Sequence, residues 1–252
     1  MKPAVNGKRL SFYRTLKPSE YEYFQEFLKT MREARNAIIL AGGLGLRLRK
    51  LVKDIPKPMA PIAGKPFLEY LMLQLVTWGI NEVILSVGYR GDVIKSYFGN
   101  GDKIGIKIRY AEEKEPLGTA GALKMAAELL DEEDCIVMNG DSFLDIEFDV
   151  LIDFHKVNNA KVSMGLVDVN DASRYGRVVV DDNGSIVGFV EKGTSGAGTI
   201  NGGVYVVNRE IVKSIPSGVV SLEKDVLPLL TRRGLYGRVA AGFFMDIGVP
   251  ED

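Results

Sequence analysis

Cysteine and histidine are nearly absent from this chain of 252 residues, which holds one of each. Cys135 alone cannot form a disulfide within the chain, and no signal peptide is visible, so we expect a reducing, cytoplasmic setting. A zinc site or a Cys–His dyad needs more of these residues than Cys135 and His155 provide. Any bound metal is therefore expected to be a hard cation held by carboxylates.

An excess of charge of either sign is also missing, since 32 Lys and Arg residues stand against 33 Asp and Glu residues. No overall basic field predicts a nucleic-acid partner. No apolar run reaches the length of a membrane span, so we expect no membrane partner. The composition, with 46% hydrophobic residues, is typical of a globular protein, and the length is ample for a buried core.

The most distinctive stretch runs from residue 36 to residue 70. The apolar run 37–40 predicts a buried strand, and the glycine-rich turn 41–45 follows it. Six cations come next in the chain: Arg47, Arg49, Lys50, Lys53, Lys57 and Lys65. Glycines let backbone N–H groups approach an anion closely, and the cations neutralise it. Pro56 and Pro58 restrict the backbone around Lys57 and aim its side chain. The stretch therefore predicts a polyphosphate site at the edge of an α/β sheet.

Two common glycine motifs do not fit this stretch. A Walker A loop needs Gly-Lys-Ser/Thr at a fixed spacing, which does not follow here. The dinucleotide-binding fingerprint is half matched, because Gly43 and Gly45 are present but Leu48 stands at the position of the third glycine. The acidic residue expected after the second strand is also missing. These departures argue against a dinucleotide-dependent oxidoreductase.

Predicted strands and helices alternate through the rest of the chain. We expect helices at 66–78, 92–98, 118–130, 150–157 and 222–230. We expect strands at 37–40, 82–88, 104–110, 135–138, 161–167, 202–207 and 238–245, and a hairpin of 178–180 with 186–190. This alternation predicts an α/β fold with a Rossmann-like, doubly wound, mainly parallel mixed sheet. We assign residues 37–252 to this one domain.

Residues 1–36 differ from the rest and are expected to form an N-terminal extension with one amphipathic helix. Ser19 is the predicted N-cap, and Tyr21, Phe24, Leu28 and Met31 recur at helical spacing. We expect an extension without chemistry. An oligomer contact or a regulatory arm is the alternative.

Two aspartates follow apolar strands that lie far apart in the sequence. Asp141 comes after the strand 135–138, and Asp246 comes after the strand 238–245. Carboxylates at the ends of two strands can converge on one Mg²⁺ that bridges two substrates. We therefore predict a magnesium site formed by Asp141 and Asp246, with a pair of turn-forming aspartates as the alternative.

The run Gly42-Gly43-Leu44-Gly45-Leu46-Arg47, followed by Pro56-Lys57-Pro58-Met59, resembles the signature of the sugar-1-phosphate nucleotidyltransferases. The resemblance extends from residue 37 to residue 252 and implies the nucleotide-diphospho-sugar transferase type of fold. It also implies in-line transfer of a nucleoside monophosphate to a sugar 1-phosphate, with pyrophosphate leaving. Leu46 is a departure, because the family usually has Thr or Ser there.

The resemblance assigns catalytic roles to Arg47, Lys57, Asp141 and Lys192. Arg47 and Lys57 would hold the triphosphate and stabilise the leaving pyrophosphate, and Lys192 would bind the attacking phosphate. Further nucleotide contacts are expected at Leu40, Ala41, Gly42, Gly43 and Gly45, at Gly118 and Thr119, and at Asn139 and Gly140 on the ribose side.

The loop 112–121 resembles the nucleobase loop of the family, and its Glu113 bears on the choice of base. Uracil and thymine offer one N–H donor between two carbonyl acceptors, which suits an amide side chain. Guanine offers the adjacent donors N1–H and N2–H₂, which suit a carboxylate. Glu113 therefore favours guanine, unless the loop is only a solvated acidic loop.

The sugar-phosphate site is expected at Tyr175, Gly176, Glu191, Lys192, Asn201 and Gly203. Here the resemblance implies that Glu191 accepts sugar hydroxyls. Gly193 is a second departure, because the family usually has proline at this position. Without the resemblance these residues would be ordinary hairpin and turn residues.

Within the family, the motifs most resemble the D-glycero-D-manno-heptose 1-phosphate guanylyltransferase group. This resemblance implies GTP and heptose 1-phosphate as substrates, Mg²⁺ as cofactor and a product that is used for surface glycans. Mannose-1-phosphate guanylyltransferase is the near alternative, and uridylyl, thymidylyl or cytidylyl transfer is more distant. A catalytically silent, nucleotide-sugar-binding regulatory subunit is the non-enzymatic alternative. The sequence leaves the exact sugar and a homo-oligomer open.

Overall fold

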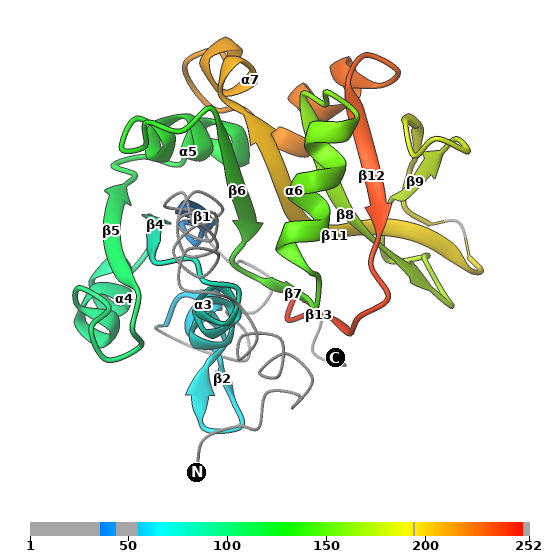
Figure 1. Cartoon of the computed structure of the whole chain (residues 1–252). Helices are drawn as coiled ribbons and strands as arrows, with labels where there is room; N and C mark the ends of the chain where they lie inside the picture. Colours follow the sequence, from blue (N-terminus) through cyan, green and yellow to red (C-terminus); the bar gives the residue numbers. More distant parts are fainter. Residues whose placement is uncertain (1–35, 44–54, 194, 249–252) are drawn as a thin grey trace, which may run out of the picture. The chain divides into compact units, whose positions relative to one another are not determined.

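The central sheet is arranged around β1 (Asn36–Leu40), which pairs in parallel with β4 (Glu82–Val87) on one side and β6 (Asp134–Asn139) on the other. β5 (Lys107–Glu112) continues the parallel arrangement beyond β4. These strands are apolar almost throughout because helices cover both faces of the sheet. The computed structural model describes residues 36–43, 55–193 and 195–248, and Figure 1 shows their arrangement.

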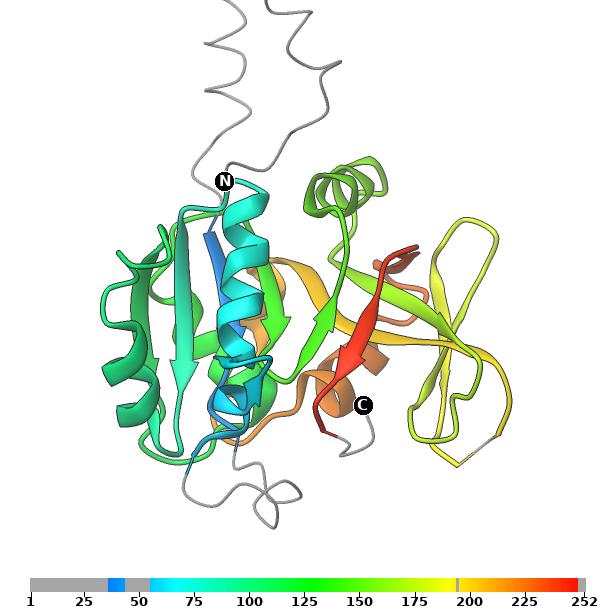
Figure 2. The same cartoon turned by 90° about the horizontal axis from the view of Figure 1, so that it is seen from below.

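The other half of the nine-stranded sheet contains antiparallel pairs. β11 (Gly198–Asn208) runs antiparallel to both β6 and β8 (Val162–Val169), and β12 (Leu235–Val239) adds to β8 in parallel. The hairpin of β9 (Arg177–Val180) and β10 (Ile186–Val190) joins β11 where Ile200 pairs with Arg177. In Figure 2 this hairpin lies at the opposite end of the sheet from α4 (Gly91–Phe98). The prediction of an α/β fold with a doubly wound mixed sheet is therefore confirmed.

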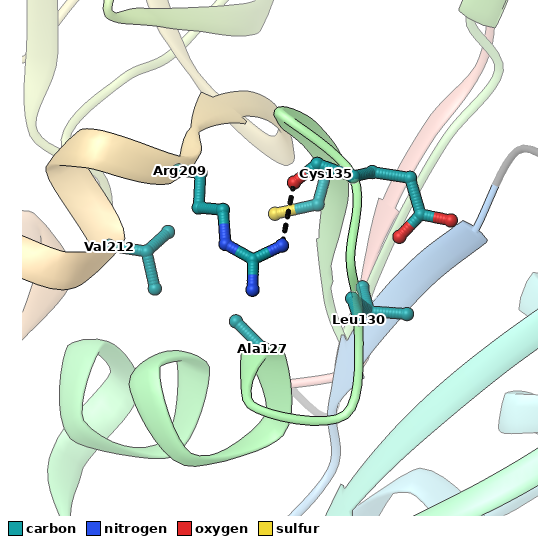
Figure 3. A pocket seen from close by; sticks show the side chains of 6 residues that line it. Ala127, Leu130, Cys135, Arg209 and Val212 are labelled. Atoms are coloured by element: carbon teal, nitrogen blue, oxygen red, sulfur yellow. Dashed lines mark hydrogen bonds between the residues drawn. The ribbon is translucent and has the colours of Figure 1, made fainter.

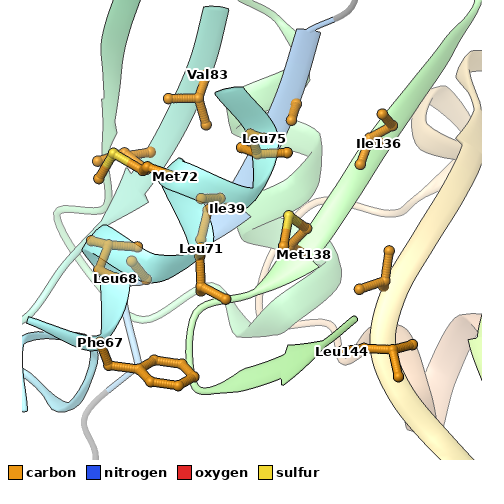
Figure 4. Close-up of a cluster of buried hydrophobic side chains, with 14 of the residues drawn as sticks. Ile39, Phe67, Leu68, Leu71, Met72, Leu75, Val83, Ile136, Met138 and Leu144 are labelled. Carbon is orange, nitrogen blue, oxygen red and sulfur yellow. The ribbon is translucent and has the colours of Figure 1, made fainter. Parts of the chain in front are cut away.

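Helices pack on both faces of the sheet, as the alternation of side chains along β1 requires. Ile39 faces a core formed with α3 (Phe67–Thr77), α4 and α6 (Phe148–Val157). Ile38 faces the opposite core, to which α5 (Gly118–Ala127) and α7 (Arg209–Ser214) contribute. Figure 4 shows the first core, where the α3 residues Phe67, Leu68, Leu71, Met72 and Leu75 lie against Ile39, Val83, Ile136 and Met138.

Several short elements lie near the carboxyl ends of the parallel strands. They are the 3₁₀ turn η2 (Lys57–Met59), the two-residue strands β2 (Pro61–Ile62) and β3 (Lys65–Pro66), and the pair β7 (Ser142–Leu144) with β13 (Phe244–Asp246). The pairing of β13 with β7 brings the last described strand to the loop that follows β6.

The predicted α-helix at 222–230 is wrong in type. The chain forms a π-helical turn, η3 (Leu222–Val226), followed by a 3₁₀ turn, η4 (Leu227–Leu230). Pro228 explains the change, because proline has no N–H to donate to the carbonyl four residues earlier and its ring clashes with that carbonyl.

The predicted strand at 238–245 is wrong in extent, because β12 already ends at Val239 and β13 begins at Phe244. Gly242 lies between them, and a Cβ there would come within 2.0 Å of the Asp145 carbonyl oxygen. The Asp145 N–H donates to the Phe243 carbonyl at 2.8 Å, so the chain turns toward β7 at this point.

Other boundaries differ by a few residues. The predicted strand 104–110 begins only at Lys107, and the predicted helix 118–130 ends at Ala127. The hairpin prediction is confirmed: the Asp181 carboxylate accepts the N–H groups of Asn183 and Ser185, and Gly184 has φ +79°. The predicted helix of the N-terminal extension lies outside the described residues, so that extension stays a prediction.

Leu71→Ala should lower the free energy of unfolding by about 2–5 kcal/mol, because Leu71 is fully buried between α3 and the sheet and its loss leaves a cavity. Urea denaturation of the full chain measures this change. Val157→Ala is the matched control, since this aliphatic side chain at the end of α6 is 85% exposed and its loss should change stability by about 0.5 kcal/mol or less. Equal losses for the two variants would contradict the packing described for α3.

Candidate active site

The candidate site lies at the edge of the sheet where the parallel strands β1 and β6 end at the same level. Leu40 is level with Asn139, and the Gly140 N–H donates to the Leu40 carbonyl at 3.0 Å. A Cβ on Gly140 would lie 2.7 Å from that carbonyl oxygen, so only glycine allows this approach. The turn that begins at Ala41 is therefore held directly against the segment 139–141.

Lys57 and the two predicted metal ligands form the charged centre of the site. The Lys57 ammonium lies 2.5 Å from Asp141 Oδ2 and 3.9 Å from Asp246 Oδ1. Asp246 reaches this point because β13 pairs with β7, and the Ile247 N–H donates to the Asp141 carbonyl at 3.0 Å. The Lys57 side chain is 14% exposed, against 43% for Asp141 and 24% for Asp246. The structure thus brings together three predicted residues from distant parts of the chain.

The donor set of this centre fits a hard divalent cation. Asp141 and Asp246 offer carboxylate oxygens, and Asp141 remains open to solvent on one side. Among the described residues, no group of three or more His, Cys, Asp or Glu side chains gathers as a complete metal site. Mg²⁺ is commonly held by one or two carboxylates, with substrate phosphates and water completing its octahedral shell. Two converging aspartates are therefore sufficient protein ligands for such a cation.

Glu113 lies against the glycine turn. A Cβ on Gly42 would come within 2.0 Å of Glu113 Oε1, so Gly42 leaves the space that this carboxylate fills. The carboxylate accepts the Leu117 N–H at 3.0 Å on Oε2 and the Ser86 hydroxyl at 3.4 Å on Oε1. Each oxygen keeps further acceptor capacity, because an ionised carboxylate has about four acceptor positions. The predicted base-reading group is thus oriented by its own loop and by β4.

Gly118 and Thr119 begin α5, and both make close contacts within the protein. Gly118 has φ +72°, and a Cβ there would lie 2.5 Å from the Val220 carbonyl oxygen. The Thr119 hydroxyl donates to Glu223 Oε2 and accepts the Leu222 N–H, each at 2.7 Å. Gly118 therefore packs the start of α5 against Val220, and Thr119 binds it to the first two residues of η3. Their predicted nucleotide contacts stay predictions.

The predicted sugar residues Asn201 and Gly203 lie at a bulge of β11 beside the end of β6. The Asn201 amide donates to the Tyr205 hydroxyl at 2.6 Å, and its carbonyl oxygen accepts the Gly203 N–H at 2.9 Å. Gly203 has φ +77°, and a Cβ there would lie 2.2 Å from the Ser142 hydroxyl oxygen. The bulge is therefore packed against the same loop that carries Asp141.

Tyr175, another predicted sugar residue, packs against β13. Its ring packs edge-on against Phe244 with 6.1 Å between centroids, and the Arg174 guanidinium lies 5.9 Å from the Tyr175 ring centroid. Phe244 is two residues before Asp246 on the same strand, so Tyr175 is packed near the charged centre. Gly176 passes close to β10, where a Cβ would lie 3.3 Å from the Val190 carbonyl oxygen.

Glu191 and Lys192 follow β10 and are exposed. Within the part of the chain that the structure describes, neither side chain makes a hydrogen bond or an ion pair. The loop that carries them is anchored, since the Gly193 N–H donates to the Ser173 carbonyl and the Arg177 guanidinium donates to the carbonyls of Ser195 and Gly196. The structure does not bring Lys192 into contact with Lys57 or the two aspartates. Gly45 and Arg47 lie outside the described residues.

Sequence reasoning missed three polar residues at this edge of the sheet. Ser86 is fully buried at the end of β4, Glu223 accepts the Thr119 hydroxyl, and Tyr205 is fully buried beneath the β11 bulge. Burial raises the pKa of the Tyr205 phenol, so it stays protonated. Their partners lie between 4 and 104 positions away along the chain, and no short motif marks them.

The lone histidine and the lone cysteine are both buried and lie away from these residues. The His155 ring lies between the Ser163 hydroxyl at 3.0 Å and the Asp134 carboxylate at 3.5 Å. A hydrogen bond from His155 holds the pKa of the Asp134 carboxyl below its usual range. Cys135 lines a small pocket with Arg209, Val212, Ala127 and Leu130, shown in Figure 3, and burial raises its pKa to about 12. A thiol with that pKa is not a nucleophile at neutral pH.

A glycine turn at the end of a central parallel strand, a lysine and two carboxylates define the class of the protein as a phosphate-handling α/β protein. Residues 36–252 match the family described as nucleotidyl transferase, and the chain belongs to this family. Members of this family generally use a divalent metal ion.

Relatives with stated activities cover most of the chain. D-glycero-alpha-D-manno-heptose 1-phosphate guanylyltransferase of Campylobacter jejuni is 44% identical over 221 residues, which is 86% of this chain and 96% of the relative. Mannose-1-phosphate guanylyltransferase of Mycobacterium tuberculosis is 40% identical over 223 residues, 86% of this chain and 62% of the relative.

Solved structures agree with the sequence comparisons. The crystal structure of HddC from Yersinia pseudotuberculosis superposes with a TM-score of 0.79 at 37% identity, covering 86% of this chain and 95% of that one. The same protein complexed with GMP-PN superposes with a TM-score of 0.77 at 36% identity and the same coverage. Across the described residues, every helix is too short or too polar to span a membrane.

Lys57→Ala should strengthen the binding of a divalent cation to the nucleotide-free protein. The Lys57 ammonium neutralises Asp141 and Asp246, and without it the two carboxylates repel each other until a cation binds. Thermal melting with increasing Mg²⁺ or Mn²⁺ should therefore show a lower Tm without metal, and a larger metal-induced rise than in the wild type. Lys107, an exposed side chain that pairs with Glu82, gives the control Lys107→Ala, which should match the wild type. Equal metal-induced shifts for Lys57→Ala and the wild type would contradict this arrangement.

Proposed function

We propose that this chain transfers GMP from GTP to D-glycero-D-manno-heptose 1-phosphate, releasing pyrophosphate and forming GDP-heptose. The convergence of Lys57, Asp141 and Asp246 beside the glycine turn carries the proposal, because this centre supplies the charges that phosphoryl transfer needs. The 44% identity to a heptose 1-phosphate guanylyltransferase over nearly its full length supports the choice of substrates.

The reaction joins an oxygen of the sugar phosphate to the α-phosphorus of GTP and breaks the bond from that phosphorus to the leaving pyrophosphate. No protein nucleophile is needed, and catalysis rests on positioning and charge neutralisation. Asp141 and Asp246 would hold Mg²⁺, which neutralises charge on the phosphates when bound. Lys57 would exchange its contact with Asp141 for the triphosphate, together with Arg47, and Lys192 would bind the phosphate of the sugar.

The choice of guanine rests on Glu113. Its two oxygens accept one protein hydrogen bond each and keep capacity for two more. Two adjacent acceptors match the N1–H and N2–H₂ donors of guanine and would repel the carbonyl oxygens of uracil. The structure of a 36% identical relative complexed with GMP-PN supports a guanine nucleotide as ligand.

Mannose-1-phosphate guanylyltransferase activity is the second candidate, favoured by the 40% identity to the mycobacterial enzyme. The two candidates differ only in the sugar, which is read on the side of Tyr175, Asn201 and Glu191. A silent regulatory subunit is disfavoured, because it would have no need for Lys57, Asp141 and Asp246 to converge. A cytoplasmic location and a homo-oligomer remain predictions.

Pyrophosphate release should be fastest for GTP with heptose 1-phosphate in a matrix of five nucleoside triphosphates against heptose-, mannose- and glucose-1-phosphates. EDTA should abolish the release, and Mg²⁺ should restore it. Asp141→Asn should lose at least about a hundredfold in kcat, because one metal ligand loses its charge while the side chain keeps its size. The Tm of this variant should stay within a few degrees of the wild type. A folded wild-type protein that releases no pyrophosphate with any pair would refute the proposed activity, and a fully active Asp141→Asn would refute the metal assignment.

Glu113→Gln should lower kcat/KM for GTP by about ten- to hundredfold, which corresponds to the loss of one hydrogen bond to a charged group. The same change should raise the rate with UTP or dTTP, since an amide can pair with their N–H and carbonyl groups. The amide oxygen can still accept the Leu117 N–H, so the loop should keep its shape. Glu112→Gln is the control, because Glu112 is the exposed neighbour that pairs with Lys95. An unchanged nucleotide profile for Glu113→Gln would rule out base reading by this residue.

A further inference from the structure

The Thr119 hydroxyl orients a carboxylate that no motif indicates. A threonine hydroxyl has one proton to donate, and Thr119 gives it to Glu223 Oε2 at 2.7 Å. The same hydroxyl accepts the Leu222 N–H at 2.7 Å, which fixes it from the other side. Thr119 therefore holds the Glu223 carboxylate with its single hydroxyl proton, and this arrangement points to a role for Glu223.

Glu223 is held by neutral donors only. The Ser221 hydroxyl also donates to Oε2, at 3.1 Å, so both recorded hydrogen bonds fall on one oxygen of the carboxylate. Across residues 36–43, 55–193 and 195–248, no Lys or Arg forms an ion pair with Glu223, and Oε1 receives no hydrogen bond. The half-buried carboxylate therefore keeps Oε1 open as a hydrogen-bond acceptor.

The backbone around Glu223 is irregular, and this irregularity helps to orient the Glu223 side chain. Ser221 caps the turn by accepting the Lys224 N–H at 3.2 Å, and η3 then follows as a π-helical turn instead of an α-helix. Single π turns are rare and are frequently found at functional sites. The Val220 carbonyl accepts N–H groups from Ala120 and Gly121, so the whole segment is bound to the first turn of α5.

The buried Tyr205 connects Glu223 with Asn139 and Asn201, which are predicted to bind the ribose and the sugar. After the larger effect of burial, the negative charge of Glu223 raises the pKa of the Tyr205 phenol, to which Asp141 also contributes. The Tyr205 hydroxyl accepts the Asn201 amide at 2.6 Å. Asn139, at the end of β6, has a buried side-chain carbonyl oxygen without a hydrogen-bond partner in the part of the chain that is described. Among the described residues, Asn139 Oδ1 and Glu223 Oε1 are thus two acceptors without a protein donor, and both side chains act on the buried Tyr205.

We propose that Glu223 is a substrate-binding residue that accepts a hydrogen bond from a sugar hydroxyl, with Thr119 and Ser221 as positioning residues. The inference rests on the proposed function, which supplies two sugar rings: the ribose of GTP and the ring of the sugar 1-phosphate. Hydroxyl groups are the donors that both rings offer, and a carboxylate already oriented by two neutral donors binds them without changing its own conformation.

Glu223→Gln tests this assignment in steady-state kinetics with GTP, 2′-deoxy-GTP, 3′-deoxy-GTP and heptose 1-phosphate. The variant should raise the KM of one substrate about tenfold or more while kcat changes less. If a ribose hydroxyl is the partner, Glu223→Gln should not raise the KM for the one deoxynucleotide that lacks this hydroxyl. If the sugar ring is the partner, the KM for heptose 1-phosphate should rise, and the three nucleotides should be affected equally little.

Positioning is tested through Thr119. Thr119→Val keeps the shape of the side chain but removes the hydroxyl, so it should reproduce the KM effect of Glu223→Gln, whereas Thr119→Ser should restore wild-type values. Glu210→Gln, an exposed acceptor-only residue at the start of α7, is the matched control. Wild-type KM values for Glu223→Gln, or equal losses of kcat/KM with every substrate and analogue, would overturn the inference.

Calorimetric titration with GTP and with GDP-mannose gives a readout that does not depend on turnover. An active wild type with an unaffected Glu223→Gln variant would overturn the role of Glu223 alone. A folded but inactive wild type would overturn the proposed function. In that case, about tenfold weaker binding of GTP or GDP-mannose by Glu223→Gln would support the role of Glu223, and unchanged binding would overturn it.

Discussion

The parallel register of β1 with its two neighbours determines where the candidate site lies. Leu40 is level with both Ser86 of β4 and Asn139 of β6, so three strands end at the same edge. The carboxyl ends of parallel strands are where open α/β sheets bind ligands. A shift of one residue in this register would turn each side chain to the other face of the sheet, so the packing of both cores and the position of the site depend on the same pairing.

Close contacts within the protein explain the glycines at this edge of the sheet, without reference to any substrate. Gly42 leaves room for the Glu113 carboxylate, Gly140 lets β6 approach the Leu40 carbonyl, and Gly203 leaves room for the Ser142 hydroxyl. The groups that are proposed to bind substrate are therefore held in place by packing within the protein. A site that is formed in advance loses less entropy when substrate binds and orients the reacting groups from the start.

Much of the fold could be predicted because its signals are local. The run 37–40 is apolar throughout, the Asp181–Gly184 turn carries its own hydrogen bonds, and the α3 stripe recurs at helical spacing. The errors arose where a single residue overrides its surroundings: Pro228 prevents a continuous α-helix, and Gly242 lets the chain turn toward Asp145. For the site, the meeting of Asp141 with Asp246 could be expected from two strand ends. The hydrogen bond from Thr119 to Glu223 joins residues 104 positions apart, and no sequence pattern in either segment predicts it.

β11 has a consequence for how such enzymes can change their specificity. This strand of 11 residues is anchored between β6 and β8 at one end and carries the β9–β10 hairpin beside its other end, with the Asn201–Val204 bulge between them. Residues beyond the bulge make no pair with the parallel strands, so substitutions and insertions there can alter the β9–β10 hairpin while the parallel half of the sheet stays intact. If the hairpin side binds the acceptor sugar as proposed, the choice of sugar can change without a change in the strands that carry the glycine turn and Asp141.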